Sequence, residues 1–251
     1  MGIAQAGIAF RVSGSVADLE AFMTCVFGEQ ATEIALPVSA RFDIRNHSDV
    51  MVQTFGEVCF ISNDDLAWPM IRNDARDAAR LHAALGAPEL LLAFCHDDSS
   101  GSHGYAVFEH GKRTRTRLQT CGLPDIPALV ESGAPLAFER RWLAARHYIE
   151  AQTPAEAATA PADTRVYFLG EREVVVPFRD LTGRMLHDGL DALFGVCPWE
   201  TLLTPTYRFF RLGPERMHAD EPAISRARPI APVKPPWWQF LLAFRGLFGQ
   251  A

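Results

Sequence analysis

Two β-prone runs joined by a short glycine-containing turn place the strongest constraint on the fold of this chain. The runs are Gly104–Phe108 and Lys112–Gln119, and Glu109–Lys112 joins them. Gly111 supplies the positive φ that a tight hairpin turn demands. The apolar run Glu89–Cys95 ends a few residues earlier and is typical of a core strand. We therefore expect an antiparallel sheet built around this hairpin.

Hydrophobic periodicity predicts further elements on both sides of the hairpin. Helical spacing followed by a glycine stop indicates helices at Val16–Phe27, Asp74–Leu85 and Leu181–Phe194. Alternating or continuous apolar runs indicate strands at Gly7–Val12, Arg41–Arg45, Met51–Phe55, Val58–Ser62, Val166–Leu169, Glu173–Phe178 and Thr206–Leu212. Together these elements predict an α+β fold, with a mostly antiparallel mixed sheet flanked by a few helices.

Two segments of unusual composition divide the chain. Residues 150–164 (EAQTPAEAATAPADT) are small, polar and spaced by prolines, which is linker composition. Residues 222–251 are rich in proline, contain no acidic residue and end in an aromatic-rich stretch. We predict one α+β domain over residues 1–212 with an internal linker at 150–164. A Pro-rich arm and an amphipathic C-terminal helix would follow over residues 213–251.

The apolar part of this tail, Trp237–Phe248, is too short to span a bilayer. As a helix it would align large apolar side chains on one side. Such a helix could dock on its own domain, bind a partner protein or make peripheral contact with a membrane surface. For partner binding, the predicted contact residues are Trp237, Trp238, Phe240 and Phe244.

Charge and cysteine content narrow the classes of function. The net charge of −6 gives no whole-molecule attraction for nucleic acid or anionic lipid, so we do not expect nucleic-acid binding unless a local patch provides it. The five cysteines are far apart and odd in number, which fits neither a disulfide framework nor a zinc knuckle. The N-terminus lacks the basic region of a signal peptide. We therefore expect a cytoplasmic protein with reduced thiols.

A polar cluster follows the predicted core strand and contains the donor atoms of a metal or catalytic site. Its candidate catalytic residues are Asp97, Asp98 and His103, and its candidate metal ligands are His96, Asp98 and His103. Neighbouring residues on a strand point to opposite faces, which opposes convergence of this cluster on one ion. The alternative is a solvated loop from Asp97 to His103, because Asp, Ser and Gly satisfy turn backbones locally.

Other catalytic signatures are missing from the sequence. Gly101–Gly104 does not form the G-x-S-x-G nucleophile elbow, since its serine directly follows the first glycine. No phosphate-binding loop or dinucleotide fingerprint occurs, so we predict no cofactor. A pair such as Cys95 and His147 could still meet in the fold, although free cysteines are usually buried.

An alternating arginine row, formed by Arg113, Arg115 and Arg117, is the most interpretable polar feature. Strict alternation would place all three on one face of the strand. They could pair with acidic neighbours on a solvent-facing sheet, or they could bind an anionic surface of a partner. A three-residue turn with a bulge would bring Glu109 opposite Arg113, and we prefer it to a two-residue turn that pairs Phe108 with Arg113.

Three motifs resemble those of an uncharacterised bacterial domain family. They are the hairpin Gly104–Lys112 (GYAVFEHGK) with Arg115, the segment Gly133–Glu139 (GAPLAFE) and the helix end Ala192–Gly195 (ALFG). Members of that family carry a G-[FY]-A-V-[WF]-E-x-G hairpin, a G-x-P-L-x-F-E segment and an A-L-F-G helix end in this order. The resemblance implies a shared fold over roughly residues 50–200 and no known activity.

These observations favour a non-catalytic cytosolic protein that binds another protein, such as an immunity protein or antitoxin that neutralises a toxin or effector. The proposed contacts are Arg113, Arg115, Arg117 and the aromatic side chains of the tail. The alternative is a hydrolase or metal-dependent enzyme that uses Asp97, Asp98 and His103. A third hypothesis is nucleic-acid binding through the arginine row.

Overall fold

The computed structural model describes residues 4–12, 18–35, 42–44, 46–72, 75–121, 126–149 and 164–213. The expected C-terminal helix, with Trp237, Trp238, Phe240 and Phe244, lies outside the described residues. All of the expected linker except Thr164 also lies outside them. The fold within the described ranges is α+β, as the sequence predicts.

Nine strands form the main sheet, in the spatial order β2-β12-β3-β4-β1-β5-β6-β7-β8. Every neighbouring pair of described strands in this sheet is antiparallel, so the expected parallel component of a mixed sheet does not occur there. The strands are β1 (Ala4–Arg11), β2 (Ala31–Ile34), β3 (Asp49–Phe55), β4 (Val58–Ser62), β5 (Leu90–Asp97), β6 (Ser102–Glu109), β7 (Lys112–Gln119), β8 (Leu129–Ser132) and β12 (Thr206–Leu212).

A second, smaller sheet has the order β11-β10-β9 and is also antiparallel. Its strands are β9 (Arg146–Ile149), β10 (Arg165–Leu169) and β11 (Val174–Pro177). The helices are α1 (Leu19–Phe27), α2 (Asp64–Arg72), α3 (Ala75–Ala84), α4 (Ala137–Leu143), the short 3-10 helix η2 (Phe178–Asp180) and α6 (Leu181–Phe194).

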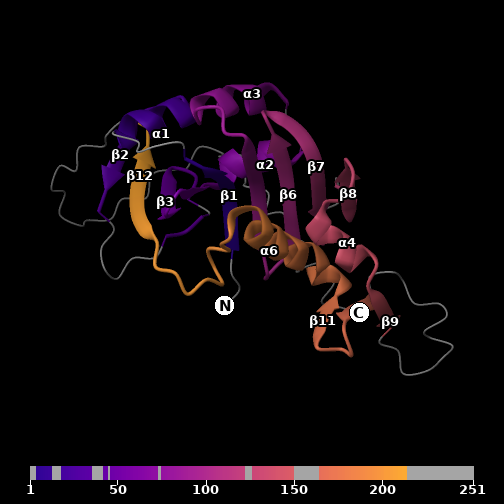
Figure 1. The fold of residues 1–251 in the computed structure, drawn as a ribbon. Coiled ribbons are helices and arrows are strands. Elements are labelled where there is room, and N and C mark those ends of the chain that lie inside the picture. The colour runs from indigo at the N-terminus through magenta and orange to yellow at the C-terminus, as the bar shows by residue number, and fades with distance from the viewer. Residues whose placement is uncertain are drawn as a thin grey trace, which may run out of the picture.

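Helices cover both faces of the main sheet, and each face carries its own apolar core (Figure 1). On one face, side chains such as Ile8 and Ala93 pack with Met23 of α1 and Met70 of α2. On the other face, the intervening residues of the same strands pack with α4, α6 and the small sheet. Because central strands are covered on both sides, they are continuous apolar runs rather than alternating ones.

Capping explains why some helix ends follow the sequence prediction. Gly28 adopts φ 74° after α1 and donates its backbone N–H to Thr24 O, which confirms the expected stop. Gly195 ends α6 in the same way, with φ 77°. The start of α1 differs from the expected Val16, because Asp18 is the N-cap and accepts a hydrogen bond from Ala21 N.

Several elements differ from the sequence prediction. Helix α2 was not expected, since it contains Pro69, and proline normally interrupts a helix interior. The prediction of a strand at Arg41–Arg45 is wrong for its described residues, because residues 42–44 form no strand. Short elements such as β2, β8, β9 and α4 have too few residues to show a clear period.

The hairpin between β6 and β7 closes with a two-residue turn. Glu109 pairs with Lys112 and Phe108 with Arg113, so the preferred three-residue turn is wrong. His110 and Gly111 have φ values of 49° and 75°, and positive φ at both positions is the geometry of a type I′ turn. A register shift follows between Val107 and Phe108. The strands therefore do contain a bulge, but it lies inside the ladder rather than at the turn.

Candidate metal centre

The register shift in the hairpin separates the three arginines. Val107 pairs with Arg115 while Phe108 pairs with Arg113, so the strict alternation that would put both arginines on one face is broken. Arg113 donates hydrogen bonds to Ile71 O and Met70 O at the end of α2 and lies over the ring of Phe108. Carbonyls at a helix C-terminus accept such cations well.

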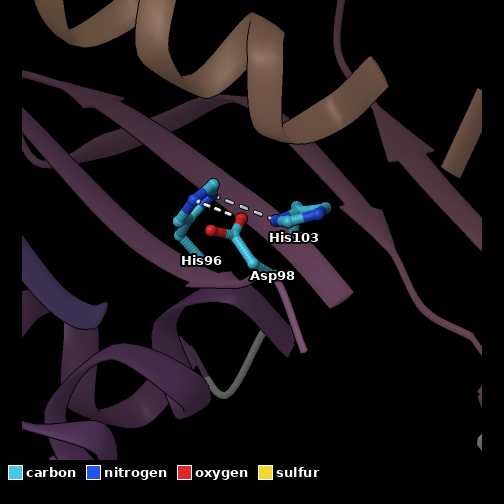
Figure 2. A group of neighbouring side chains, drawn as sticks. All are labelled: His96, Asp98 and His103. Carbon is cyan, nitrogen blue, oxygen red and sulfur yellow. Dashed lines mark hydrogen bonds and ion pairs between the residues drawn. The ribbon is translucent and has the colours of Figure 1, made fainter. Parts of the chain in front are cut away.

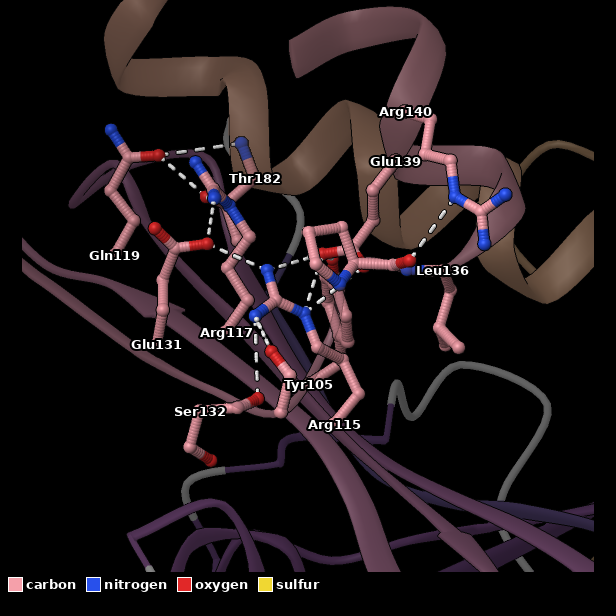
Figure 3. Close-up of polar contacts among 12 residues, drawn as sticks. Tyr105, Arg115, Arg117, Gln119, Glu131, Ser132, Leu136, Glu139, Arg140 and Thr182 are labelled. Atoms are coloured by element: carbon pink, nitrogen blue, oxygen red, sulfur yellow. Dashed lines mark hydrogen bonds and ion pairs between the residues drawn. The ribbon is translucent and has the colours of Figure 1, made fainter.

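Arg115 lies on the opposite face of the sheet, buried beside α4. Its guanidinium donates to both carboxylate oxygens of Glu139 and to Glu131 (Figure 3). Tyr105 donates its hydroxyl to the same Glu139 carboxylate at 2.5 Å. Burial and the neighbouring Glu139 charge raise the pKa of Tyr105, so its proton stays in this contact. The network ties α4 to β6, β7 and β8 of the main sheet.

Arg117 is buried next to Arg115 and shares Glu131 with it. Arg117 Nη1 lies 2.5 Å from Glu131 Oε1, and Nε donates to the Thr182 hydroxyl at the start of α6 (Figure 3). Burial raises the pKa of Glu131, but hydrogen bonds and charge from the two arginines outweigh this and hold it below its ordinary value. The expected pairing of the arginines with acidic neighbours therefore occurs for Arg115 and Arg117, but with buried guanidinium groups rather than on a solvent-facing sheet.

The arginines consequently do not form the exposed surface that the partner-binding and nucleic-acid hypotheses assume. Arg115 and Arg117 are each only 2% exposed. Since their cations are already paired, an anionic partner would have to displace Glu131 and Glu139 and unpack α4 or α6. Of the three, Arg113 alone is partly exposed, and its guanidinium is already engaged with α2.

The histidines of the polar cluster lie side by side on neighbouring strands. His96 of β5 pairs with His103 of β6, so both belong to the ladder rather than to a loop. The loop expected from Asp97 to His103 shrinks to the turn at residues 98–101. This correction has a simple cause: the strands continue to Asp97 and Ser102, and cross-strand partners point to the same face.

Asp98 folds back over this pair from the turn, whereas Asp97 does not join it. Asp98 Oδ1 lies 2.9 Å from His96 Nε2, and His96 Nδ1 lies 3.1 Å from His103 Nδ1 (Figure 2). Asp97 instead accepts hydrogen bonds from the backbone and hydroxyl of Ser99 and stabilises the turn. Of the predicted catalytic set, Asp98 and His103 thus lie close together, and Asp97 has a local structural role.

One donor atom from each of His96, Asp98 and His103 lies within 4.8 Å of the other two. Two imidazoles and a carboxylate are a common ligand set for divalent transition metals. The proposed metal-ligand set from the sequence is therefore the set that the fold brings together, despite the argument against it. Neighbours along one strand do point to opposite faces, whereas His96 and His103 are partners across two strands and share a face.

The protonation pattern of the cluster follows from its contacts. An ionised Asp98 can only accept, so His96 Nε2 carries a proton and His96 Nδ1 accepts from His103 Nδ1–H. His103 Nε2 is then left without a proton, and it is buried with no hydrogen-bond partner among the described residues. Burial, together with the nearby His96, lowers the pKa of His103 to about 4. Burial also lowers the pKa of His96, although nearby carboxylates act against it. Both rings are therefore neutral at pH 7, which is the form that binds metals.

Helix α6 and the turn after it cover the cluster. Gly183 lies against the His103 ring, and a Cβ at this position would be 3.0 Å from Nδ1. Trp199 stacks on His96 with ring centroids 5.1 Å apart and an interplanar angle of 11°. Gln119, the β7 neighbour of His103, accepts hydrogen bonds from both the backbone and the hydroxyl of Thr182. Gly183 of α6 therefore packs against the His103 imidazole, and Trp199 packs against the His96 imidazole.

Sequence reasoning missed Gly183, Trp199 and Gln119. Gln119 could have been found, since it ends the strand that pairs with His103 and is the polar residue after an apolar Leu118. Gly183 and Trp199 lie 80 or more residues from His103, and only the tertiary packing of α6 brings them there. Nothing in the sequence around Gly183 or Trp199 indicates that either residue lies beside the histidines.

The three buried cysteines do not support thiol catalysis. Cys59, Cys95 and Cys197 are buried. Burial raises the pKa of Cys59 to about 12 and that of Cys197 to about 12, and it raises the pKa of Cys95 as well. A thiol that stays protonated is a poor nucleophile, so the suggested Cys95–His147 chemistry has no support.

None of the described helices combines the length and apolar character that crossing a bilayer requires. No protein-family model, curated protein or solved structure matches this chain. The resemblance of its motifs to an uncharacterised bacterial family therefore stays a prediction. Function has to be argued from the chemistry of the site itself.

Proposed function

We propose that this protein binds one divalent transition-metal ion through His96, Asp98 and His103. The observation that carries the proposal is the 3.1 Å separation of the two imidazole Nδ1 atoms. Two nitrogen ligands of one tetrahedral zinc ion lie about 3.3 Å apart, given Zn–N bonds of about 2.0–2.1 Å. An ion could take the place of the proton between the two Nδ1 atoms if the His103 proton moves to Nε2. Asp98 would then have to leave the opposite, Nε2 edge of His96 to reach the ion.

Three protein ligands leave a coordination position for water, which is the arrangement of catalytic rather than structural zinc sites. A bound ion would lower the pKa of that water and supply a hydroxide for hydrolysis. Between the two functions predicted from the sequence, these contacts favour the metal-dependent enzyme. Partner binding as an immunity protein or antitoxin stays a prediction. Of its predicted contact residues, Arg115 and Arg117 are buried, Arg113 is bonded to α2, and the aromatic residues lie outside the described part of the chain.

The proposed location is the cytoplasm, where thiols remain reduced. Cys59, Cys95 and Cys197 are buried free thiols. Intracellular proteins usually keep their cysteines in this form.

Zinc titration of the purified full-length protein, first stripped with a chelator, tests the proposed function. We expect one Zn²⁺ per chain in calorimetry, and at least about tenfold weaker binding in Asp98→Asn and in His103→Asn. Ser99→Ala is the matched control, because Ser99 lies in the same turn and bonds Asp97 rather than the cluster. Absence of stoichiometric Zn²⁺, Co²⁺, Fe²⁺ and Mn²⁺ binding in the folded wild-type protein would reject the site.

A further inference from the structure

Two neighbouring side chains of β7 hold the start of α6 in place. Gln119 Oε1 accepts hydrogen bonds from the Thr182 hydroxyl at 2.7 Å and from the Thr182 backbone N–H at 3.3 Å. Arg117 Nε donates to the same hydroxyl at 2.9 Å (Figure 3). Gln119 Nε2 also donates to Phe178 O, at 2.7 Å. The Thr182 hydroxyl therefore donates one hydrogen bond and accepts another, and both partners belong to β7.

These contacts take the place of a local cap at the beginning of α6. Asp180, the N-cap residue, makes no side-chain hydrogen bond to the first turn. The first backbone N–H groups of a helix have no partner within the helix and need one elsewhere. Gln119 provides it for Thr182 from the sheet. Because Arg117, Gln119 and Thr182 are each at most 2% exposed, a lost contact among them leaves a buried polar group unsatisfied.

The residue anchored in this way directly precedes the glycine that touches His103. Gln119 pairs with His103 across β7 and β6, so both side chains lie on the same face of the sheet. A Cβ at Gly183 would lie 3.0 Å from His103 Nδ1 and 3.1 Å from Cε1 and Cγ. The position of Thr182 thus sets how closely the backbone of α6 approaches the imidazole.

The His103 imidazole depends on this packing because few polar contacts orient it. His103 Nδ1 lies 3.1 Å from His96 Nδ1, whereas His103 Nε2 is buried and has no hydrogen-bond partner among the described residues. In metal sites, the ring nitrogen that does not bind the ion usually donates to a carboxylate or carbonyl, and this contact fixes the ring. Since His103 lacks such a contact within the described part of the chain, packing against α6 has to limit rotation of its ring.

We infer that Thr182 is a positioning residue for the metal centre: its hydroxyl, held between Arg117 and Gln119, sets Gly183 against the His103 imidazole. The inference rests on the proposed function, since it concerns the orientation of one of the three proposed ligands. Thr182 does not itself bind the ion. Without the hydroxyl, the start of α6 can move away from β7 and the imidazole gains freedom to rotate. Zn²⁺ then has to order the ring on binding, which weakens its affinity.

The variants Thr182→Val and Thr182→Ser test this inference in the full-length protein. Valine has nearly the shape of threonine but no hydroxyl, whereas serine retains the hydroxyl. We expect Thr182→Val to weaken Zn²⁺ binding at least about tenfold in calorimetry, and Thr182→Ser to weaken it less than about threefold. In Co²⁺-loaded protein, Thr182→Val should change the visible absorption spectrum, and Thr182→Ser should leave it close to that of the wild type.

A control variant and a measurement without metal separate positioning from general stability. Gly189→Ala puts a Cβ 2.8 Å from the Phe138 ring in the apolar core, so it disturbs α6 away from the Thr182 contacts. Its Zn²⁺ affinity should stay within about twofold of wild type. In metal-free protein, the nuclear Overhauser effect between the Gly183 α-protons and the His103 ring should weaken in Thr182→Val but not in Thr182→Ser or Gly189→Ala.

The outcomes distinguish this inference from the proposed function. If the wild type binds Zn²⁺ and His103→Asn does not, while Thr182→Val binds as tightly as the wild type, positioning by Thr182 is refuted and the three-ligand site stands. Equal losses of affinity in Thr182→Val and Gly189→Ala would also refute it. If the wild type binds no metal ion, the proposed function fails and the inference fails with it. Circular dichroism shows that each variant compared is folded.

Discussion

Gly183 lies directly against the His103 ring of the candidate metal centre. Replacing it with Ala places a methyl group 3.0–3.1 Å from three atoms of the His103 ring. Because the ring is buried, the helix or the imidazole has to shift by a few tenths of an ångström. We expect Gly183→Ala to weaken Zn²⁺ binding and to lower the free energy of unfolding by about 1–3 kcal/mol. Calorimetry and urea denaturation measure the two effects.

A second glycine of the same helix provides the control. A Cβ at Gly189 would lie 2.8 Å from the Phe138 ring, in the apolar core and away from the imidazoles. Gly189→Ala should therefore destabilise the protein comparably but leave Zn²⁺ affinity within about twofold of wild type. Equal losses of affinity in both variants would mean that Gly183 acts only through stability.

At the residue scale, the sequence names the candidate residues His96, Asp98 and His103 that the fold brings together, but not the reason they meet. Asp-Asp-Ser-Ser-Gly between two β runs indicates a turn, and extending both strands up to it pairs His96 with His103. The arginines show the opposite case. Alternation predicts that all three arginine side chains lie on one face of the strand. The extra residue of the bulge turns Arg113 to the other face, and nothing in the composition indicates that bulge.

Helix α4 is fastened to α6 by one buried carboxylate, Asp188. It accepts hydrogen bonds from Trp142 Nε1 at 2.5 Å and Arg141 Nε at 3.2 Å, and Arg184 lies 3.1 Å away. Burial raises the pKa of Asp188. The hydrogen bonds from Arg141 and Trp142 and the positive charges of Arg184 and Arg141 lower it by more, so the pKa lies below its ordinary value. The ionised form is therefore the stabilising one.

The stability contributed by Asp188 should depend on pH. Its folded pKa lies below its unfolded value, so the stabilisation is present above the unfolded pKa and is lost as pH falls through the folded pKa. We expect Asp188→Asn to be about 1–3 kcal/mol less stable than wild type at pH 7, with a gap that narrows below about pH 4. Urea denaturation at pH 7 and pH 3 measures both gaps, with the exposed Asp191→Asn of the same helix as control. A gap that is equal at both pH values would contradict this.

At the element scale, long periodic segments are predictable and short or interrupted ones are not. Both α6 and β12 have the predicted bounds, because each has a clear period and α6 has a glycine stop. Helix α2 escapes prediction since Pro69 argues against it locally, whereas burial of Ala67, Met70 and Ile71 against the sheet outweighs that cost.

At the scale of the whole molecule, the main sheet of the described chain has an apolar core on each face, and its strands should differ in stability accordingly. Central strands β1 and β5 are covered on both faces, whereas β2 and β8 are the outermost described strands of the main sheet. We expect backbone amides of β1 and β5 to exchange with solvent most slowly and those of β2 to exchange faster. Hydrogen exchange followed by mass spectrometry of the folded protein measures this order. Exchange in β2 that is as slow as in β5 would show that the sheet opens only as one unit.

The place of β12 in the sheet has a consequence for synthesis on the ribosome. Strand β12 lies between β2 and β3, and the ribosome synthesises both of these partner strands before it reaches residue 56. These early strands wait for residues 206–212 to emerge, and until then their facing edges are unpaired. Unpaired edges in a nascent chain are sites of aggregation and of chaperone binding. The order of strands thus makes this a protein whose sheet closes late, after most of its chain has been translated.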